Sequence, residues 1–269
     1  MQVRLFDDEG DVAREGARLV AGWLAAHPTG TVLPATGNSP MALYGELAAL
    51  RERGVFDPGG LRVAQLDEYV GVPDDDPRSL FGWLRCSFAE PLGIGDERIV
   101  RLPGDAPDDA GLATACRAFD EAIAAAGGID VAILGLGPNG HLGFNEPPSP
   151  PDAPTRVVEL SEASLASSAG YWSGGPAVVP RRALTAGMGW LLGAGHVLLV
   201  VTGARKRNIL RRMLVEPVDP ALPGSLLRTV PSAVLLADRA AWPAELPPPA
   251  EGDDGAATRP IPGMASSGG

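Results

Sequence analysis

The chain has 269 residues, a formal net charge of −11 and a hydrophobic fraction of 45%. This length is typical of one large α/β domain or two small ones, and the hydrophobic fraction suffices for a sizeable core. The acidic balance and the lack of an extended basic block argue against nucleic acid as a partner. An anionic ligand would therefore need a local pocket of cationic side chains and backbone N–H groups.

Cysteine usage and the N-terminal segment bear on localisation. Cys86 and Cys116 lack the spacing of metal ligands, which indicates reduced thiols. Acidic residues between Asp7 and Asp11 occupy the place where a signal peptide has its apolar region, and no apolar run approaches the length of a membrane span. We expect a cytoplasmic protein without a membrane partner.

Helical and strand-like segments alternate along the chain. Helices are expected at residues 11–26, 40–47, 79–92, 111–126 and 183–192, and in a segment ending at 213. Strands are expected at residues 31–35, 61–66, 99–102, 131–134, 155–160, 196–202 and 233–237. This order predicts an α/β fold with a mostly parallel sheet covered by helices on both faces, a Rossmann-like arrangement of three layers.

Proline and small residues become frequent in the second half of the chain. Residues 148–154 predict an extended loop, and 161–180, rich in Ser, Ala and Gly, show little periodicity. We interpret about 148–182 as a lid segment. Residues 1–242 then form a single catalytic domain, and 243–269 are predicted to be a disordered tail.

Three places where a strand is expected to end carry polar residues. The strand at 31–35 leads into the turn Thr36–Ser39, with Ser39 as a helix cap and Pro40 as the first helical residue, which together make an anion cradle. An ordinary turn with a capped helix is the alternative. Lys206, at the end of the strand at 196–202, could supply a cation.

Asp67 and Glu68 follow the strand at 61–66, where they either cap the next segment or face a crevice. The segment Gly135–Pro147 places Asn139, His141 and Glu146 within eight positions directly after a buried strand. A tight turn with one satisfied histidine is the alternative, but this density of polar groups favours an active site. Since the carboxyl ends of parallel strands meet at one edge, we expect these groups to face one crevice.

Three blocks carry a family resemblance. They are Leu33-Pro-Ala-Thr-Gly-Asn-Ser-Pro40, Gln65-Leu-Asp-Glu-Tyr-Val-Gly-Val72 and Gly135-Leu-Gly-Pro-Asn-Gly-His-Leu-Gly-Phe-Asn-Glu-Pro147. Together they resemble the glucosamine-6-phosphate deaminase/isomerase family, within a wider group that includes 6-phosphogluconolactonases. The resemblance covers about residues 10–240. Lactonases usually continue after Gly-His with Ala-Ser-Leu-Phe-Pro, so the Leu-Gly-Phe-Asn-Glu-Pro of this chain favours the deaminase branch.

The resemblance implies roles for individual residues. Asp67 matches the base that moves a proton between C2 and C1 of the opened sugar, and His141 matches the residue that serves ring opening at O5. Glu146 and Asn139 match the partners that orient this histidine. The implied substrate and phosphate site comprises Thr36, Gly37, Asn38, Ser39, Gly137 and Lys206. No metal or cofactor is implied, because the amine of the substrate activates C2 and then leaves as ammonia.

Two departures from the family pattern bear on specificity. Asn139 stands where many members have Asp. Deaminases usually carry a phosphate-binding Arg in the lid, where this chain has Gly170. Lys206 is then expected to be the dominant cation, unless Arg181 or Arg182 reaches in from the far end of the lid. The lid resembles the galactosamine-6-phosphate isomerase branch at least as well as the glucosamine branch.

The sequence therefore predicts an enzyme that converts a 2-amino-2-deoxyhexose 6-phosphate to a ketohexose 6-phosphate and ammonia. Three alternatives stay open. They are a dehydratase acting on an N-acetylhexosamine 6-phosphate, a hydrolase of the 6-phosphogluconolactonase type and a non-catalytic sugar-phosphate sensor. The only partner expected is a small-molecule sugar phosphate, and assembly into a homo-oligomer is left open.

Overall fold

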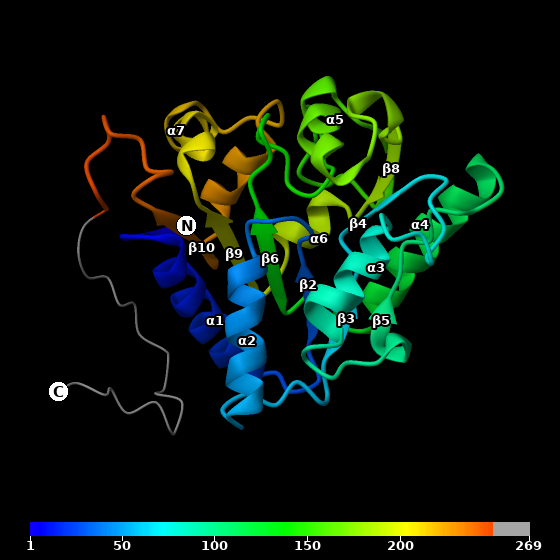
Figure 1. Ribbon diagram of the computed structural model, residues 1–269, viewed down its shortest axis with the longest axis horizontal. Coiled ribbons are helices and arrows are strands. Elements are labelled where there is room, and N and C mark those ends of the chain that lie inside the picture. Colours follow the sequence, from blue (N-terminus) through cyan, green and yellow to red (C-terminus); the bar gives the residue numbers. More distant parts are fainter. Residues whose placement is uncertain (250–269) are drawn as a thin grey trace.

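A computed structural model describes residues 1–249, and a seven-stranded sheet lies at its centre (Figure 1). The strand order is β1-β10-β9-β6-β2-β3-β5, and all the pairings between neighbours are parallel. The strands are β1 (Gln2–Phe6), β2 (Thr31–Pro34), β3 (Arg62–Ala64), β5 (Ile99–Val100), β6 (Val131–Gly135), β9 (His196–Val201) and β10 (Ala233–Asp238). The sequence patterns located these strands except β1, which they missed.

Helices cover both faces of this sheet. On one face lie α1 (Glu9–Ala25), α2 (Met41–Glu52) and α3 (Leu80–Leu84), which continues into a π-helical turn at Arg85–Ala89. On the other lie α4 (Asp109–Ala125), α6 (Met188–Leu192) and α7 (Arg207–Val215). This confirms the predicted three-layer α/β fold. Within the described part of the chain, no helix is long and apolar enough to cross a membrane.

Strand β6 shows how the sequence divides its side chains between the two cores. Val131 and Ile133 pack with α1 and α2, whereas Ala132 and Leu134 pack with α4 and α6. Successive side chains of a strand point to opposite faces, so a strand covered on both sides is apolar throughout. All four of these side chains are fully buried. The central strand therefore holds the turn that follows it rigidly against both helical layers.

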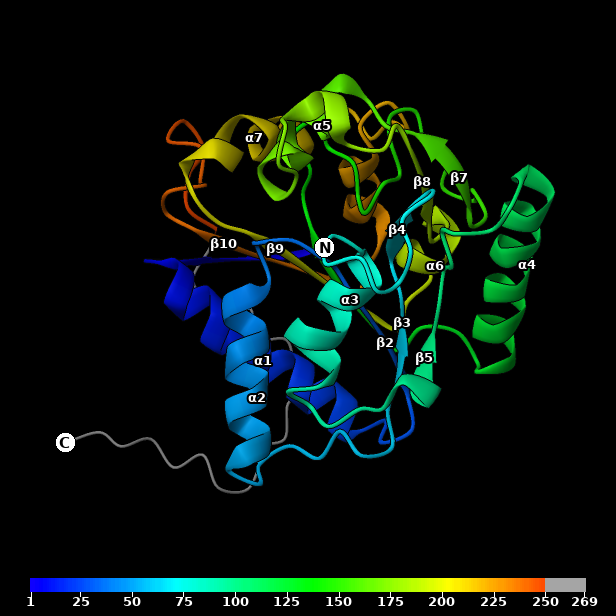
Figure 2. The same ribbon diagram turned by 45° about the vertical axis from the view of Figure 1, so that its right-hand side comes forward.

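A second sheet of three antiparallel strands lies beyond the large one. Its order is β4 (Asp67–Tyr69), β8 (Arg182–Thr185) and β7 (Arg156–Glu159). Together with α5 (Glu162–Ser168) it lies above the large sheet in Figures 1 and 2. A third apolar cluster, which includes Tyr69, Phe144, Leu165 and Trp172, joins these elements.

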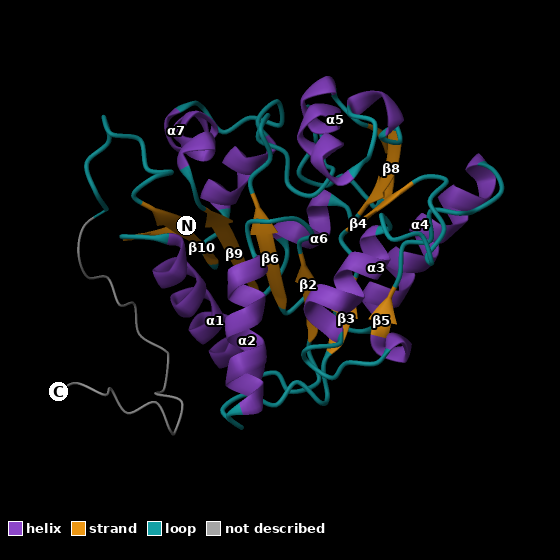
Figure 3. Ribbon diagram, in the orientation of Figure 1, coloured by secondary structure: helices purple, strands orange, loops and turns teal. Residues whose placement is uncertain are grey.

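The structure corrects two expectations for this region. Residues 183–192 were predicted to be one helix, but the segment begins in β8, and α6 is only five residues long. Pairing with β4 and β7 overrides the helical propensity of Ala183 and Leu184. The stretch 161–180, expected to be irregular, contains α5 and two 3₁₀ turns, so the predicted lid has regular structure (Figure 3).

The predicted tail at 243–269 lies mostly outside the described residues, which end at 249. The described part, residues 243–249, is neither helix nor strand. It turns back on the domain, since Nε1 of Trp242 donates a hydrogen bond to the carbonyl of Leu246 and Glu245 pairs with Arg211 at 2.6 Å.

Candidate active site

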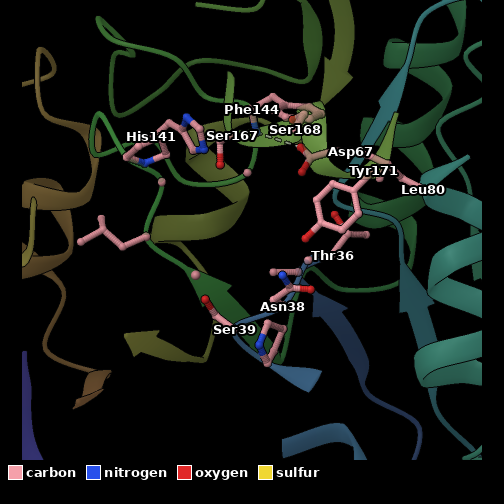
Figure 4. A pocket seen from close by; sticks show the side chains of 18 of the residues that line it. Thr36, Asn38, Ser39, Asp67, Leu80, His141, Phe144, Ser167, Ser168 and Tyr171 are labelled. Atoms are coloured by element: carbon pink, nitrogen blue, oxygen red, sulfur yellow. Dashed lines mark hydrogen bonds between the residues drawn. The ribbon is translucent and has the colours of Figure 1, made fainter. Parts of the chain in front are cut away.

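A cavity of about 1180 Å³ opens at the carboxyl ends of β2, β6 and β9, beneath α5 and the small sheet. Eight of the ten predicted site residues line it. They are Thr36, Gly37, Asn38, Ser39, Asp67, Gly137, His141 and Lys206. The other two, Asn139 and Glu146, contact each other behind the imidazole of His141. Figure 4 shows Asp67, His141 and the Thr36–Ser39 turn on different sides of the same opening.

Glycine at position 137 is needed for this arrangement. A Cβ atom there would lie 2.1 Å from both Cδ2 and Nε2 of His141, far inside van der Waals contact. Any larger residue would displace the imidazole. The polar turn after β6 thus depends on Gly137 for close approach between backbone and side chain.

Asp67 is the first residue of β4, and its side chain is 3% exposed. One carboxylate oxygen, Oδ1, accepts hydrogen bonds from the hydroxyl of Thr185 at 2.7 Å and from the N–H of Phe144 at 3.0 Å. Burial raises the pKa of Asp67 to about 7, although these two hydrogen bonds act in the opposite direction. A carboxyl group with a pKa near neutrality can both take and return a proton at physiological pH.

The neighbouring Glu68 binds backbone groups at the start of a helix instead. Its carboxylate accepts the N–H groups of Leu80 and Phe81, at 3.0 and 2.9 Å, at the start of α3. It also accepts a bond from the side chain of Gln65. Of the two alternatives for this acidic pair, Glu68 therefore caps a helix and Asp67 faces the cavity.

His141 is held through its Nδ1 atom. This atom lies 3.1 Å from Oγ of Ser164 and 3.6 Å from Oε2 of Glu146. The same Glu146 oxygen accepts a 2.6 Å hydrogen bond from the amide of Asn139, and Oε1 accepts the N–H of Ser161 at 3.2 Å. Burial by itself would raise the pKa of Glu146, but hydrogen bonds from His141, Ser164 and Asn139 outweigh it and lower the pKa to about 2. A charged carboxylate therefore faces the imidazole.

The turn at Thr36–Ser39 differs in one detail from expectation. Helix α2 begins at Met41 and Pro40 occupies its cap position, so no side chain caps the helix. Ser39 instead lines the cavity. Gly37 adopts a φ of +102°, which favours glycine and turns the chain between β2 and α2.

Lys206 also lines the cavity and follows β9. Its Nζ donates a 2.5 Å hydrogen bond to the carbonyl of Leu136, and burial lowers its pKa. Arg181 and Arg182, the two cations considered as alternatives to Lys206, do not line the cavity. Arg181 pairs with the exposed Glu162 at 3.2 Å, and Arg182 pairs with Asp109 at 2.8 Å.

Arg205, Arg78 and Tyr171 are among the cavity-lining residues that the sequence patterns missed. Arg205 precedes Lys206 and forms no ion pair within residues 1–249. Arg78 is paired with Asp76. Tyr171 follows Gly170 in the lid, and its hydroxyl interacts with the backbone of Asn38. The sequence signal for Arg205 was its place beside Lys206 after a buried strand.

The cysteines lie apart from this site. Cys86 is exposed, and Cys116 is buried in α4 beneath the sheet, where burial raises the pKa of its thiol to about 11. Within residues 1–249, no cluster of three or more His, Cys, Asp or Glu side chains is arranged to hold a metal ion.

Residues 9–236 match the model of a protein family described as glucosamine-6-phosphate isomerases/6-phosphogluconolactonase. The chain belongs to this family. Glucosamine-6-phosphate deaminase of Streptomyces avermitilis is 39% identical over 233 residues, which is 85% of this chain and 88% of that protein. The glucosamine-6-phosphate deaminase of Cutibacterium acnes is 39% identical over 241 residues, or 90% of this chain and 91% of that protein.

Solved structures of family members have the same fold. A monomeric glucosamine-6-phosphate deaminase superposes with a TM-score of 0.85 at 29% identity, covering 90% of this chain and 98% of that one. The 6-phosphogluconolactonase of Thermotoga maritima superposes with a TM-score of 0.68 at 22% identity, covering 88% and 99%. The second likeness concerns the fold alone.

Proposed function

We propose that this chain converts a 2-amino-2-deoxyhexose 6-phosphate, either the glucosamine or the galactosamine form, to a ketohexose 6-phosphate and ammonia. The observation that carries the proposal is a buried carboxyl group of near-neutral pKa, Asp67, which faces the same cavity as His141, while Glu146 lies behind the imidazole. Relatives named glucosamine-6-phosphate deaminase support it.

The proposed reaction begins with ring opening. Nε2 of His141 takes the proton of the C1 hydroxyl and delivers it to the ring oxygen O5, and the sugar becomes an open-chain aldehyde. The charged Glu146 stabilises the imidazolium form of His141 during this transfer. Asn139 donates to the same carboxylate and so holds it in place beside the ring.

Asp67 then acts on the open-chain sugar. It takes the proton from C2 while the ammonium group of the sugar gives one to O1, which produces an enolamine. It then returns its own proton to C1, which leaves an iminium at C2. Water adds to this iminium, and ammonia leaves as the ketone forms. One group serves as base and then as acid, which suits a carboxyl whose pKa lies near 7.

The phosphate is proposed to bind between the Thr36–Ser39 turn and Lys206. Backbone N–H groups of the turn and the ammonium of Lys206 are the donors expected for a dianion. Arg205 is an additional cation on the cavity wall, and the hydroxyl of Tyr171 lies beside Asn38 of the turn. These two residues are proposed to contribute where other deaminases use an Arg of the lid.

Incubation of the purified protein with glucosamine 6-phosphate and, separately, galactosamine 6-phosphate tests the proposal. Ammonia and a ketohexose 6-phosphate should appear in equal amounts with at least one of them. N-acetylglucosamine 6-phosphate and 6-phosphogluconolactone are the comparison substrates, and Asp67→Asn is the control protein. Turnover of either comparison substrate without ammonia release from the amino sugars would contradict the proposal.

A further inference from the structure

Thr185 forms a hydrogen bond with Asp67 across the small sheet. The two residues lie opposite each other in the antiparallel pairing of β4 and β8. The hydroxyl of Thr185 is completely buried and donates to Oδ1 of Asp67 at 2.7 Å. A side-chain donor at this position therefore acts directly on the proposed base, although 118 positions separate the two residues in the sequence.

Both hydrogen bonds that the protein gives to the Asp67 carboxylate go to the same oxygen. Oδ1 accepts from Thr185 and from the N–H of Phe144. An ideal Cβ at Gly143 would lie 2.9 Å from Oδ1, so the backbone also packs against this atom. Within residues 1–249 no hydrogen bond reaches Oδ2, and the side chain lines the cavity (Figure 4).

The direction of the Thr185 proton follows from the neighbours of its oxygen. The N–H of Phe144 lies 3.2 Å from Oγ1 of Thr185, and the amide nitrogen of Asn145 lies 3.4 Å from it. Both are donors, so they face the lone pairs of the hydroxyl. The other acceptor near Thr185 is the carbonyl of Ala186 at 3.5 Å, compared with 2.7 Å for Oδ1. The proton therefore points at Asp67.

Asn145 is itself fixed in one orientation. Its Nδ2 donates to the carbonyls of Leu142 and Ala186, at 3.0 and 2.9 Å. Its Oδ1 accepts a 2.8 Å bond from the half-buried guanidinium of Arg156. The two hydrogens of Nδ2 go to these carbonyls, so Asn145 offers no acceptor to the hydroxyl of Thr185, whose proton stays directed at Asp67.

We propose that Thr185 is a positioning residue that reserves Oδ2 of Asp67 for proton transfer. Because two donors occupy Oδ1, the proton taken from C2 must reside on Oδ2 and is returned to C1 from that same atom. The hydrogen bonds to Oδ1 also stabilise the charged carboxylate and so set the lowest pH at which the base is ionised. This inference rests on the proposed role of Asp67.

Replacement of the hydroxyl by a methyl group tests the inference. Thr185→Val keeps the shape but removes the donor, whereas Thr185→Ser keeps the donor. Loss of a hydrogen bond to a charged carboxylate should raise the pKa of that carboxyl group by about one to two units. The acid limb of the pH profile of kcat/KM should therefore move up by about that much in Thr185→Val and stay near the original position in Thr185→Ser.

The matched control is Thr155→Val. Thr155 is also buried and donates to a carboxylate, that of Asp120, but it does not line the cavity. Its replacement should leave the acid limb unchanged. A Thr185→Val protein that is slower at every pH but keeps the original acid limb would show a merely structural role and overturn the inference.

A second readout does not depend on turnover. In protein labelled with ¹³C at the aspartate carboxyl groups, the Asp67 signal is identified by its loss in Asp67→Asn. Its titration midpoint should rise in Thr185→Val and remain near the original in Thr185→Ser and Thr155→Val. An unchanged midpoint in Thr185→Val contradicts the inference. Absence of ammonia release by the unmodified protein would instead contradict the proposed function.

Discussion

Nδ1 of His141 and Oε2 of Glu146 lie 3.6 Å apart, and the amide of Asn139 binds the same oxygen at 2.6 Å. A carboxylate beside Nδ1 favours the tautomer that carries its proton there, which leaves Nε2 unprotonated. The chain thus has two carboxyl groups with opposite behaviour. Burial dominates at Asp67 and raises its pKa to about 7, whereas hydrogen bonds dominate at Glu146 and lower its pKa to about 2.

Replacement of Glu146 tests whether its charge supports His141. Glu146→Gln keeps the shape of the side chain but removes the charge that stabilises the imidazolium of His141. We expect kcat to fall about ten- to a hundredfold, because His141 itself remains. Steady-state ammonia release measures it. A loss as complete as that of Asp67→Asn would mean that Glu146 carries a proton itself.

Asp67→Asn should abolish isomerisation and leave substrate binding nearly intact. The amide fills the same space but cannot take the C2 proton, so we expect kcat to fall by at least about a thousandfold. Calorimetric titration with the amino sugar phosphate should give a Kd within about threefold of that of the unmodified protein. Near-normal turnover would refute the assignment of Asp67 as the base.

The same variant should change the pH dependence of stability. Because the pKa of Asp67 is raised from 3.8 to about 7 in the folded state, the folded protein favours the neutral carboxyl. That stabilisation is complete below pH about 4 and is lost as the pH rises through 7. At pH 8.5, Asp67→Asn should be more stable than the unmodified protein, by up to about 4 kcal/mol.

Urea unfolding at pH 4 and pH 8.5 measures this difference. The stability gain from Asp67→Asn should be present at the higher pH and nearly absent at the lower. Asp152→Asn, at an exposed position, is the control and should show no such pH dependence. An equal effect of Asp67→Asn at both pH values would show that folding does not raise the pKa of Asp67.

Lys206→Ala should weaken substrate binding by roughly 2–3 kcal/mol, a thirty- to hundredfold rise in KM, because it removes a charge-assisted contact with the phosphate. Arg205→Ala should raise KM by a smaller factor, since this side chain is more exposed. Arg181→Ala and Arg182→Ala are the controls. A small effect at Lys206 with a large one at either control would identify a different phosphate-binding cation.

Much of the fold follows from periodicity in the sequence. Strands β6, β9 and β10 contain short apolar runs, and such runs are distinctive when both faces of a sheet are covered. The same patterns placed Asp67 and His141 after strand ends, because polar residues there interrupt apolar runs. β1 was missed because Gln2 and Arg4 lie among its apolar residues at an edge of the sheet.

Long-range pairing explains what periodicity could not predict. The local sequence of β8 predicts a helix because Ala and Leu have high helix propensity. The segment is a strand because it pairs with β4 and β7. The role of Thr185 depends on this pairing, so nothing near it in the sequence indicates a contact with Asp67. By contrast, Ser161 ahead of α5 was a helix-start signal that the low periodicity of the segment obscured.

The first turn of α5 contacts the residues behind the imidazole. The N–H of Ser161 donates to Glu146, and Oγ of Ser164 lies 3.1 Å from His141. Lifting α5 away from the cavity would break both contacts. Moving the start of α5 would therefore loosen the imidazole of His141, while Glu146 and Asn139, which belong to the turn after β6, would stay beside it.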